Sequence, residues 1–291
     1  MTLSTSTPIK SPALPPHSLT AHVPTTERLC VDGICFDNIP GTTALAIVRH
    51  YMDEGPSPHP RTVFFVNVHS VHVARRDAGL REAFHKADLI LPDGSGLALA
   101  GKVTNRPVWE NLNGTDFIPR VLEELTGSGR SVYLLGAQPP VLEKCVQNLA
   151  IRYPGLVIAG FRHGHFSESE AGKVIRAINE AAPDVLLVGM GTPTQETWIA
   201  RHRSELRAKI CFGVGGLFDF LSGEKPRAPR WVRDFGLEWA YRFAREPKSK
   251  WDRVLLEIPL FVARTFIGRV SVTSHPVRSH KVVESFVKAE E

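Results

Sequence analysis

Residues 87–96 read ADLILPDGSG, an apolar run that ends at Asp93 and is followed at once by glycine, serine and glycine. A short apolar run bounded by turn residues is typical of a strand buried on both faces of a sheet. Aspartate followed by glycine is typical of a tight turn. The stretch therefore predicts a buried strand that carries an acidic side chain at its carboxyl end.

The same unit recurs along the chain from residue 62 onwards: an apolar strand, a turn containing Gly, Pro or Asp, and an amphipathic helix. Buried strands that alternate with helices are typical of a mostly parallel sheet with helices on both faces. The sequence therefore predicts an α/β fold. The predicted strands span residues 62–67, 87–92, 131–136, 156–161, 184–189 and 209–214, and the predicted helices span residues 70–86, 115–127, 139–153, 168–181 and 194–206.

The composition divides the chain into four segments. Residues 1–24 are rich in Ser, Thr and Pro and predict a disordered N-terminal tail. Residues 25–224 predict the α/β core, which begins with a strand pair and a tight Asp-Gly turn at residues 29–38. Residues 225–272 predict a basic and aromatic C-terminal appendage, and residues 273–291 a flexible tail.

The basic excess of the protein lies in the appendage. Residues 225–253 hold nine Lys or Arg and four Asp or Glu, and this excess of five equals the net charge of the 291-residue chain. Trp231, Trp239 and Trp251 lie between the basic residues, and an apolar amphipathic stretch follows. The pattern fits a solvated helix face, a nucleic-acid-binding patch or a membrane-surface anchor. Tryptophans beside a stretch too short and too charged to span a bilayer favour the anchor.

The cysteines at positions 30, 35, 145 and 211 form no Cys-x-x-Cys pair and have no histidine nearby at metal-ligand spacing. No window of about 18 uninterrupted apolar residues predicts a membrane span, and the N-terminus lacks the pattern of a secretory signal. The sequence therefore predicts a reduced, cytoplasmic protein without a metal site.

Ligands of open α/β sheets bind beyond the carboxyl ends of the strands, so the residues at these ends form the candidate site. The predicted ends carry Asn67, Asp93, Gly136, GMGTPTQE (189–196) and GVGGLFDF (213–220). Glycine lets a backbone approach a ligand closely, and N–H groups at the start of a helix bind phosphate. These turns favour a nucleotide diphosphate as the ligand.

Each of these motifs also has a purely structural interpretation. The glycine turns fit tight packing, Glu196 fits the helix dipole, and Gln195, Thr115 and Asp116 fit helix caps. Asp93 fits a turn carboxylate, which the pattern alone favours, or a general base that takes a proton from a hydroxyl. A dinucleotide-dependent oxidoreductase and a nucleic-acid-binding module that uses the basic appendage are two rival functions. The absence of a G-x-G-x-x-G fingerprint disfavours the oxidoreductase, and the sequence has no P-loop either.

In their order, the motifs resemble the WecG/TagA/CpsF glycosyltransferase family, also called glycosyltransferase family 26. The resemblance covers roughly residues 60–265 and is specific, because several motifs follow one another in a fixed order. The motifs that carry it are NVHSVHVARRDAGLREAFHKADLILPDGSGLALA (67–100), NGTDFIPRVLEEL (113–125), VYLLGAQPPVLEK (132–144), YPGLVIAGFRHGHF (153–166), INEAAPDVLLVGMGTPTQETWIARHR (178–203), KICFGVGGLFDFLSG (209–223) and RAPRWVRDFGLEWAYRFAREP (227–247).

The resemblance implies a Rossmann-like α/β core with a helical C-terminal appendage that packs over the site and associates with membrane. It implies an inverting transfer of a sugar, of the N-acetylmannosamine, uronic acid or glucose type, from a UDP-sugar to a polyprenyl-diphosphate-linked saccharide in cell-surface polysaccharide biosynthesis. The implied enzyme needs no essential metal or cofactor. It is a peripheral protein on the anionic inner face of the cytoplasmic membrane, and it binds no nucleic acid. Whether it forms a homo-oligomer is left open.

The resemblance also implies roles for single residues. Asp93 matches the catalytic base. The chain departs from the family at two positions: some members carry Thr in place of Phe65, and some carry Arg in place of Asn111. The second departure removes a diphosphate contact. Arginines of the appendage are predicted to replace this contact. The predicted substrate-binding residues are Asn67, Gly94, Gly136, Gly189, Gly191, Thr192, Gln195, Gly215, Gly216, Arg227, Arg230, Arg233 and Arg242.

Overall fold

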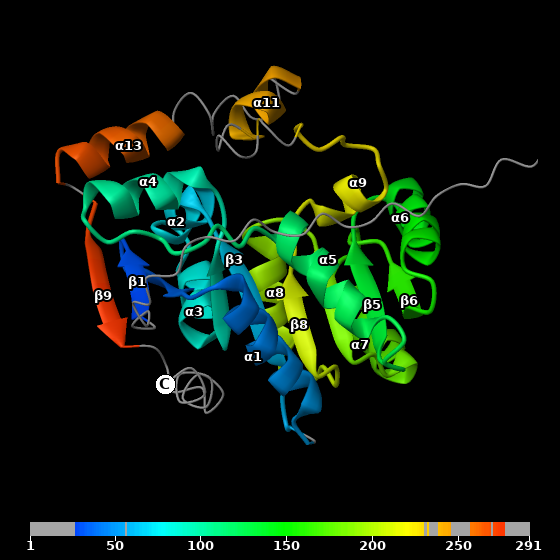
Figure 1. The fold of residues 1–291 in the computed structure, drawn as a ribbon. Coiled ribbons are helices and arrows are strands. Elements are labelled where there is room, and N and C mark those ends of the chain that lie inside the picture. The colour runs from blue at the N-terminus through cyan, green and yellow to red at the C-terminus, as the bar shows by residue number, and fades with distance from the viewer. Residues whose placement is uncertain are drawn as a thin grey trace, which may run out of the picture.

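The centre of the protein is a six-stranded parallel sheet with the strand order β4-β3-β8-β7-β5-β6 (Figure 1). The structure is a computed structural model that describes residues 27–55, 57–229, 232, 238–245, 257–268 and 270–276. Each predicted strand is present, and the predicted α/β class is confirmed. The strands are β3 (Arg61–Val66), β4 (Leu89–Pro92), β5 (Ser131–Gly136), β6 (Val157–Arg162), β7 (Val185–Gly189) and β8 (Ile210–Gly213).

Helices cover both faces of this sheet because its strands are apolar on both sides. Phe64 and Val66 point into one buried cluster, whereas Val63 and Phe65 point into the other. The first cluster is covered by α2 (Val68–Ala74), α3 (Ala78–Lys86), α7 (Ala171–Ala181) and α8 (Thr194–His202). The second is covered by α1 (Gly41–Asp53), α5 (Gly114–Leu125), α6 (Pro139–Arg152) and α9 (Leu217–Leu221).

The sequence prediction missed helix α9 and also differs from the structure at two further places. The predicted helix 70–86 is divided into α2 and α3, because the Asp77 side chain accepts a hydrogen bond from Leu80 N (2.8 Å) and starts a new helix. Helix α4 (Ser95–Val103) was not predicted, because its small residues after Asp93 have the composition of a turn.

A second, three-stranded sheet has the order β2-β1-β9. Strands β1 (Glu27–Val31) and β2 (Ile34–Asn38) form the predicted hairpin, in which Asp32 and Gly33 both have positive φ, as a tight two-residue turn requires. Strand β9 (Val272–Pro276) pairs antiparallel with β1. The predicted flexible tail therefore begins too early, because residues 273–276 complete this sheet. The predicted N-terminal tail, 1–24, and residues 277–291 lie outside the described residues.

The hairpin also corrects the predicted cysteine state. Cys30 and Cys35 lie directly opposite each other in the β1-β2 register and form a disulfide. The prediction that all cysteines are reduced is wrong for this pair, because a two-residue turn brings together residues that are five positions apart. Cys145 and Cys211 are free and buried, and burial raises the pKa of both thiols to about 12.

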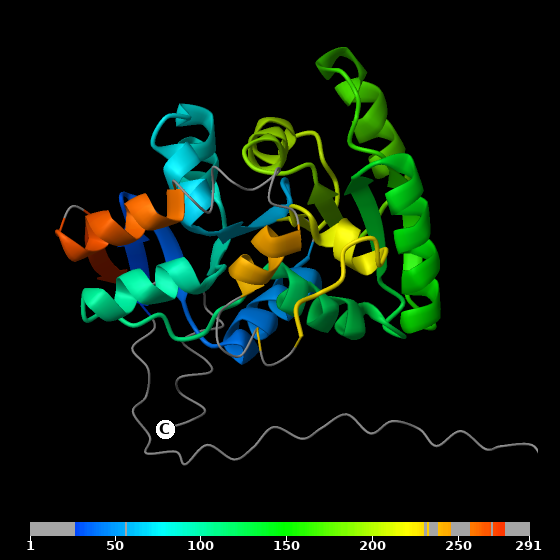
Figure 2. The ribbon, with the colours of Figure 1, turned by 90° about the horizontal axis from the view of Figure 1, so that it is seen from above.

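The appendage helices lie at the carboxyl edge of the large sheet. Figure 1 shows α11 (Glu238–Arg245) and α13 (Ile258–Phe266) at the same end of the molecule as α4 and α9, which follow strands β4 and β8. Figure 2 looks onto this end and shows α13 beside α4 and α2. Among the described residues, no helix is both long and apolar enough to cross a bilayer.

Candidate active site

The predicted site residues that follow the strands lie in a row along the carboxyl edge of the large sheet. Five neighbouring strands, β4, β3, β8, β7 and β5, end in that order at Asp93, Asn67, Gly213–Gly216, Gly189–Gly191 and Gly136. The parallel direction of the strands brings these residues to one edge although they are far apart in the sequence. One end of the row carries polar side chains, and the other end carries almost none.

Asp93 and Asn67 contact each other at the polar end. The Asn67 amide nitrogen Nδ2 donates to Asp93 Oδ2 over 3.1 Å. The orientation of this amide is fixed, because Asn67 Oδ1 accepts from Ser70 N (3.0 Å) while Ser70 Oγ accepts from Asn67 N (2.8 Å). This capping box starts α2 and leaves the Asn67 amide donor directed at the carboxylate.

The turn after Asp93 uses its two glycines in different ways. Gly94 has a φ of +97°, and a side chain added there would meet no atom within 4 Å. At Gly96, in contrast, an added Cβ would lie 2.4 Å from Val68 Cγ2, because α4 packs closely on the start of α2. A Cβ at Gly94 would therefore meet open space, whereas Val68 fills the space beside Gly96.

Asn111 supports the same turn. Its Oδ1 accepts a hydrogen bond from Gly94 N over 2.7 Å. The residue that stands where some members of the resembled family carry Arg thus holds the backbone beside Asp93. No sequence motif indicated this contact, because it joins two loops through tertiary structure.

Backbone packs against backbone at the glycine end. A Cβ on Gly136 would lie 2.2 Å from Gly189 O, and one on Gly189 would lie 2.9 Å from Gly215 O. Ala137 N also donates to Gly189 O (3.1 Å). Tight packing, the structural interpretation of these motifs, thus accounts for Gly136 and Gly189, whereas the missing side chains of Gly191 and Gly215 leave open space.

Thr192, Gln195 and Glu196 form a hydrogen-bonded group behind the glycine turns. Glu196 Oε1 accepts from Thr192 Oγ1 and from Gln195 Nε2, both at 2.9 Å. Gln195 Oε1 accepts from Gly215 N at 2.8 Å. Burial raises the pKa of the Glu196 carboxyl, and the hydrogen bonds from Gln195 and Thr192 oppose this shift. Gln195 and Glu196 are both buried, although the sequence suggested that Gln195 is a helix cap and that Glu196 interacts with the helix dipole.

Arg227 pairs with carboxylates of the protein. Its Nη1 lies 2.6 Å from Asp116 Oδ1 and its Nη2 lies 3.6 Å from Glu238 Oε2, so it connects the first turn of α5 to α11. Asn113, which accepts from Asp116 N, is the cap of α5 in place of the expected Thr115 and Asp116. Of the other predicted arginines, Arg230 and Arg233 lie outside the described residues; Arg242 belongs to α11, and its side chain is not described.

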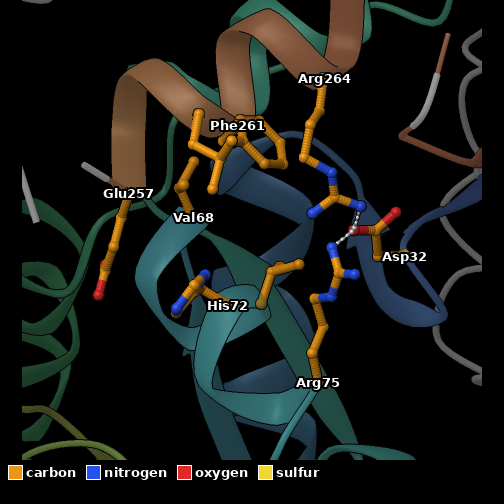
Figure 3. Close-up of a pocket in the computed structure, with 9 residues that line it drawn as sticks. Asp32, Val68, His72, Arg75, Glu257, Phe261 and Arg264 are labelled. Atoms are coloured by element: carbon orange, nitrogen blue, oxygen red, sulfur yellow. Dashed lines mark hydrogen bonds and ion pairs between the residues drawn. The ribbon is translucent and has the colours of Figure 1, made fainter.

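Polar contacts connect α13 and its N-cap residue Glu257 to α2, the helix that Asn67 caps, and to the β1-β2 turn. His69 Nδ1 lies 2.8 Å from Glu257 Oε2. Figure 3 shows Arg75, the residue after α2, and Arg264 of α13 directed at Asp32 in the β1-β2 turn; the nitrogen-to-oxygen distances are 3.2 and 3.4 Å. Asp32, Arg75, Glu257 and Arg264 line a small pocket together with His72 and four apolar side chains. These contacts place the appendage beside the Asn67 end of the row. Within the described residues, no group of three His, Cys, Asp or Glu side chains could hold a metal ion.

Comparison with known protein families matches residues 29–274 to the Glycosyl transferase WecG/TagA/CpsF family. The chain belongs to this family. Two relatives carry the name N-acetylglucosaminyldiphosphoundecaprenol N-acetyl-beta-D-mannosaminyltransferase. The one from Bacillus subtilis (strain 168) is 30% identical over 213 residues, which are 73% of this chain and 80% of the relative. The one from Staphylococcus aureus (strain MRSA252) is 31% identical over 242 residues, 81% of this chain and 91% of the relative.

Membership in the WecG/TagA/CpsF family confirms the resemblance found in the sequence and makes the chain a glycosyltransferase. It favours the transferase over the oxidoreductase and the nucleic-acid-binding module. The carboxyl-edge row is the part of this family member that combines a held carboxylate with open glycine turns.

Proposed function

We propose that this WecG/TagA/CpsF family member transfers a sugar, of the N-acetylmannosamine, uronic acid or glucose type, from a UDP-sugar to a polyprenyl-diphosphate-linked saccharide, with inversion at the anomeric carbon. The observation that carries the proposal is the Asp93 carboxylate, which Asn67 holds at one end of a row of glycine turns. The names of the relatives, which describe a sugar on undecaprenyl diphosphate as the molecule they act on, support a lipid-linked acceptor.

In the proposed reaction, Asp93 takes the proton from the attacking hydroxyl of the acceptor. The hydroxyl oxygen then forms a bond to the anomeric carbon while the bond from that carbon to the UDP oxygen breaks. The leaving diphosphate takes the bonding electrons, and its growing charge is stabilised by basic residues of the appendage and by backbone N–H groups of the turns after β7 and β8, other than those of Val214 and Gly215, which bond within the protein. Attack from the face opposite the leaving group inverts the configuration.

We also propose that the appendage places the enzyme on the cytoplasmic face of an anionic membrane, where a lipid-linked acceptor resides. Helix α13 lies at the carboxyl edge and exposes large apolar residues beside the site: Leu260 is 52% exposed, Phe266 65% and Ile267 62%. Exposed apolar side chains next to basic residues are typical of a surface that lies in a membrane interface.

A donor panel tests the reaction. Purified protein is incubated with UDP-sugars of the three types and a polyprenyl-diphosphate-linked N-acetylglucosamine, and release of UDP and the anomeric configuration of the lipid product are measured. We expect one donor to give a product of inverted configuration. Retained configuration, or no transfer from any UDP-sugar, would contradict the proposal.

A flotation assay tests the membrane proposal separately. The protein is expected to float with vesicles that contain anionic lipid and to stay behind with neutral vesicles, since basic residues contribute to the attraction. Binding to RNA in a gel-shift assay, with no flotation, would favour the nucleic-acid-binding alternative instead.

A further inference from the structure

Glu196 is an acidic residue without an assigned role, and it lies fully buried in the first turn of α8. Burial of a carboxyl group in a protein interior is costly unless hydrogen bonds compensate for the lost water. Within the described part of the chain, its oxygen Oε2 has no hydrogen-bond partner, whereas Oε1 has two. A buried acid with only one of its two oxygens hydrogen-bonded is not expected to stabilise the fold. We therefore look for the role of Glu196 in the groups that bond to its Oε1.

The two donors to Glu196 belong to the turn that follows β7. Thr192 Oγ1 and Gln195 Nε2 both donate to Oε1, so the acid ties the middle of this turn to its end. Burial favours the protonated form of the carboxyl group, and the hydrogen bonds from Gln195 and Thr192 oppose this shift. Both contacts require an acceptor oxygen at Oε1.

Through Gln195, the same acid reaches the turn that follows β8. An amide has a donor end and an acceptor end; since Nε2 faces Glu196, the oxygen Oε1 must face Gly215 N, from which it accepts a hydrogen bond of 2.8 Å. Rotation of the amide by half a turn would place two N–H groups against each other. Glu196 therefore determines which way Gln195 points, although it does not touch Gly215 itself.

The neighbouring backbone fits closely around this arrangement. A Cβ on Gly213 would lie 3.2 Å from Gln195 Nε2, and Gly189 approaches Gly215 O so closely that an added Cβ would lie 2.9 Å away. Gln195 is only 3% exposed, and both ends of its amide bond to the protein. Gln195 thus supports the Gly213–Gly216 turn from the buried side.

We propose, on the basis of the UDP-sugar donor proposed above, that Glu196 is a positioning residue that acts through Gln195 to hold the Gly213–Gly216 turn in the shape that binds the donor diphosphate. Gln195 then contributes to donor binding through Gly215 and not by contact with the donor. Donor affinity therefore depends on an acid that the donor never reaches.

Calorimetric titration with UDP tests this proposal. Glu196→Ala removes the acceptor of two hydrogen bonds, and Gln195→Met removes both ends of the amide at similar size, so each is expected to weaken UDP binding at least about tenfold, as the loss of a buried hydrogen bond would. Glu196→Gln keeps the acceptor oxygen and is expected to stay within about threefold of the unmodified protein. Arg201→Gln, at an exposed position near the far end of the same helix, is the control and is expected to bind UDP normally.

A double variant separates positioning from general damage. If Glu196 acts through Gln195, Glu196→Ala combined with Gln195→Met weakens UDP binding no more than the stronger single variant, because coupled residues are not additive. Additive losses, normal UDP binding by Glu196→Ala, or a Glu196→Gln variant as weak as Glu196→Ala would each overturn the proposal. Should circular dichroism show that Glu196→Ala does not fold, Gln195→Met and Thr192→Val decide the question by the same measure.

The failure of the donor proposal looks different. In that case the unmodified, folded protein binds no UDP at all, and every variant gives the same flat titration. A protein that binds UDP, with variants that bind it equally well, rejects only the role of Glu196.

Discussion

The two ends of the carboxyl-edge row reach their shape by opposite means. At the β4-β3 end, side chains determine the geometry: Asn67 caps a helix and uses its remaining donor to hold Asp93. At the β7-β5 end, the backbones of Gly189 and Gly136 lie so close together that no side chain fits between them. Substitutions at the first end should therefore lower turnover, and substitutions at the second end should lower the free energy of unfolding.

The largest effect on the reaction is expected at Asp93. Asp93→Asn keeps the size of the side chain but cannot take a proton, so turnover should fall by at least about 100-fold, with an unchanged melting temperature. Transfer rates with the active UDP-sugar and thermal unfolding provide the measurements. Glu143→Gln, an exposed acid on α6, is the control that should change neither. Near-normal turnover by Asp93→Asn would remove Asp93 as the base.

The largest effect on stability is expected at Gly136. Its φ is +144°, and the Cβ of an alanine there would collide with Gly189 O, so Gly136→Ala should lower the free energy of unfolding by at least about 2 kcal/mol. Urea unfolding measures this loss. The matched change Gly172→Ala, inside helix α7, should be neutral or stabilise by up to about 1 kcal/mol. Equal effects of the two changes would mean that the strand ends can move apart.

A smaller effect at Asn67 separates its two roles. Asn67→Ser keeps an oxygen for Ser70 N but is too short to donate to Asp93, so turnover should fall about tenfold or more while the free energy of unfolding changes by less than about 0.5 kcal/mol. Asn67→Ala loses the cap as well, and its free energy of unfolding should fall by about 0.5–2 kcal/mol. If both variants lose the same stability, the capping box does not stabilise α2.

The smallest expected effect is a change in how stability depends on pH. The pKa of Glu196 is raised above its ordinary value of 4.5, so the stability from its neutral form is complete below pH 4.5 and declines as the pH rises towards the raised pKa. Glu196→Gln does not titrate and should lack this decline. The free energy of unfolding of Glu196→Gln, minus that of the unmodified protein, should therefore increase with pH above 4.5. If this difference stays constant from pH 4 to pH 8, folding does not change the pKa of Glu196.

The sequence was most informative where a pattern is local. Apolar runs bounded by turns located each strand of the large sheet, and the parallel arrangement that they imply brought Asp93 and Asn67 to the same edge. Helix α4 escaped prediction because the small residues that let it pack on Val68 also have the composition of a turn.

Tertiary contacts decided the rest. An acid in the first turn of a helix is normally exposed, and nothing in GMGTPTQE indicates that Glu196 is buried. Arg227 was a candidate for the diphosphate because of its charge, but its carboxylate partner Asp116 lies on a distant segment of the chain. The disulfide at Cys30 depends on the hairpin register, which places Cys35 opposite it.

The pairing of β9 with β1 affects the order in which the protein can be completed during translation. Val31 pairs with Val272, so one edge of β1 stays without a partner until residues 272–276 have been synthesised and have left the ribosome. An unpaired strand edge attracts other strands, and the nascent chain is thus most prone to aggregate before β9 emerges. Because α13 immediately precedes β9, the step that closes this edge also brings the appendage onto α2. A chain interrupted before residue 272 would thus lack protection from aggregation and an ordered appendage together.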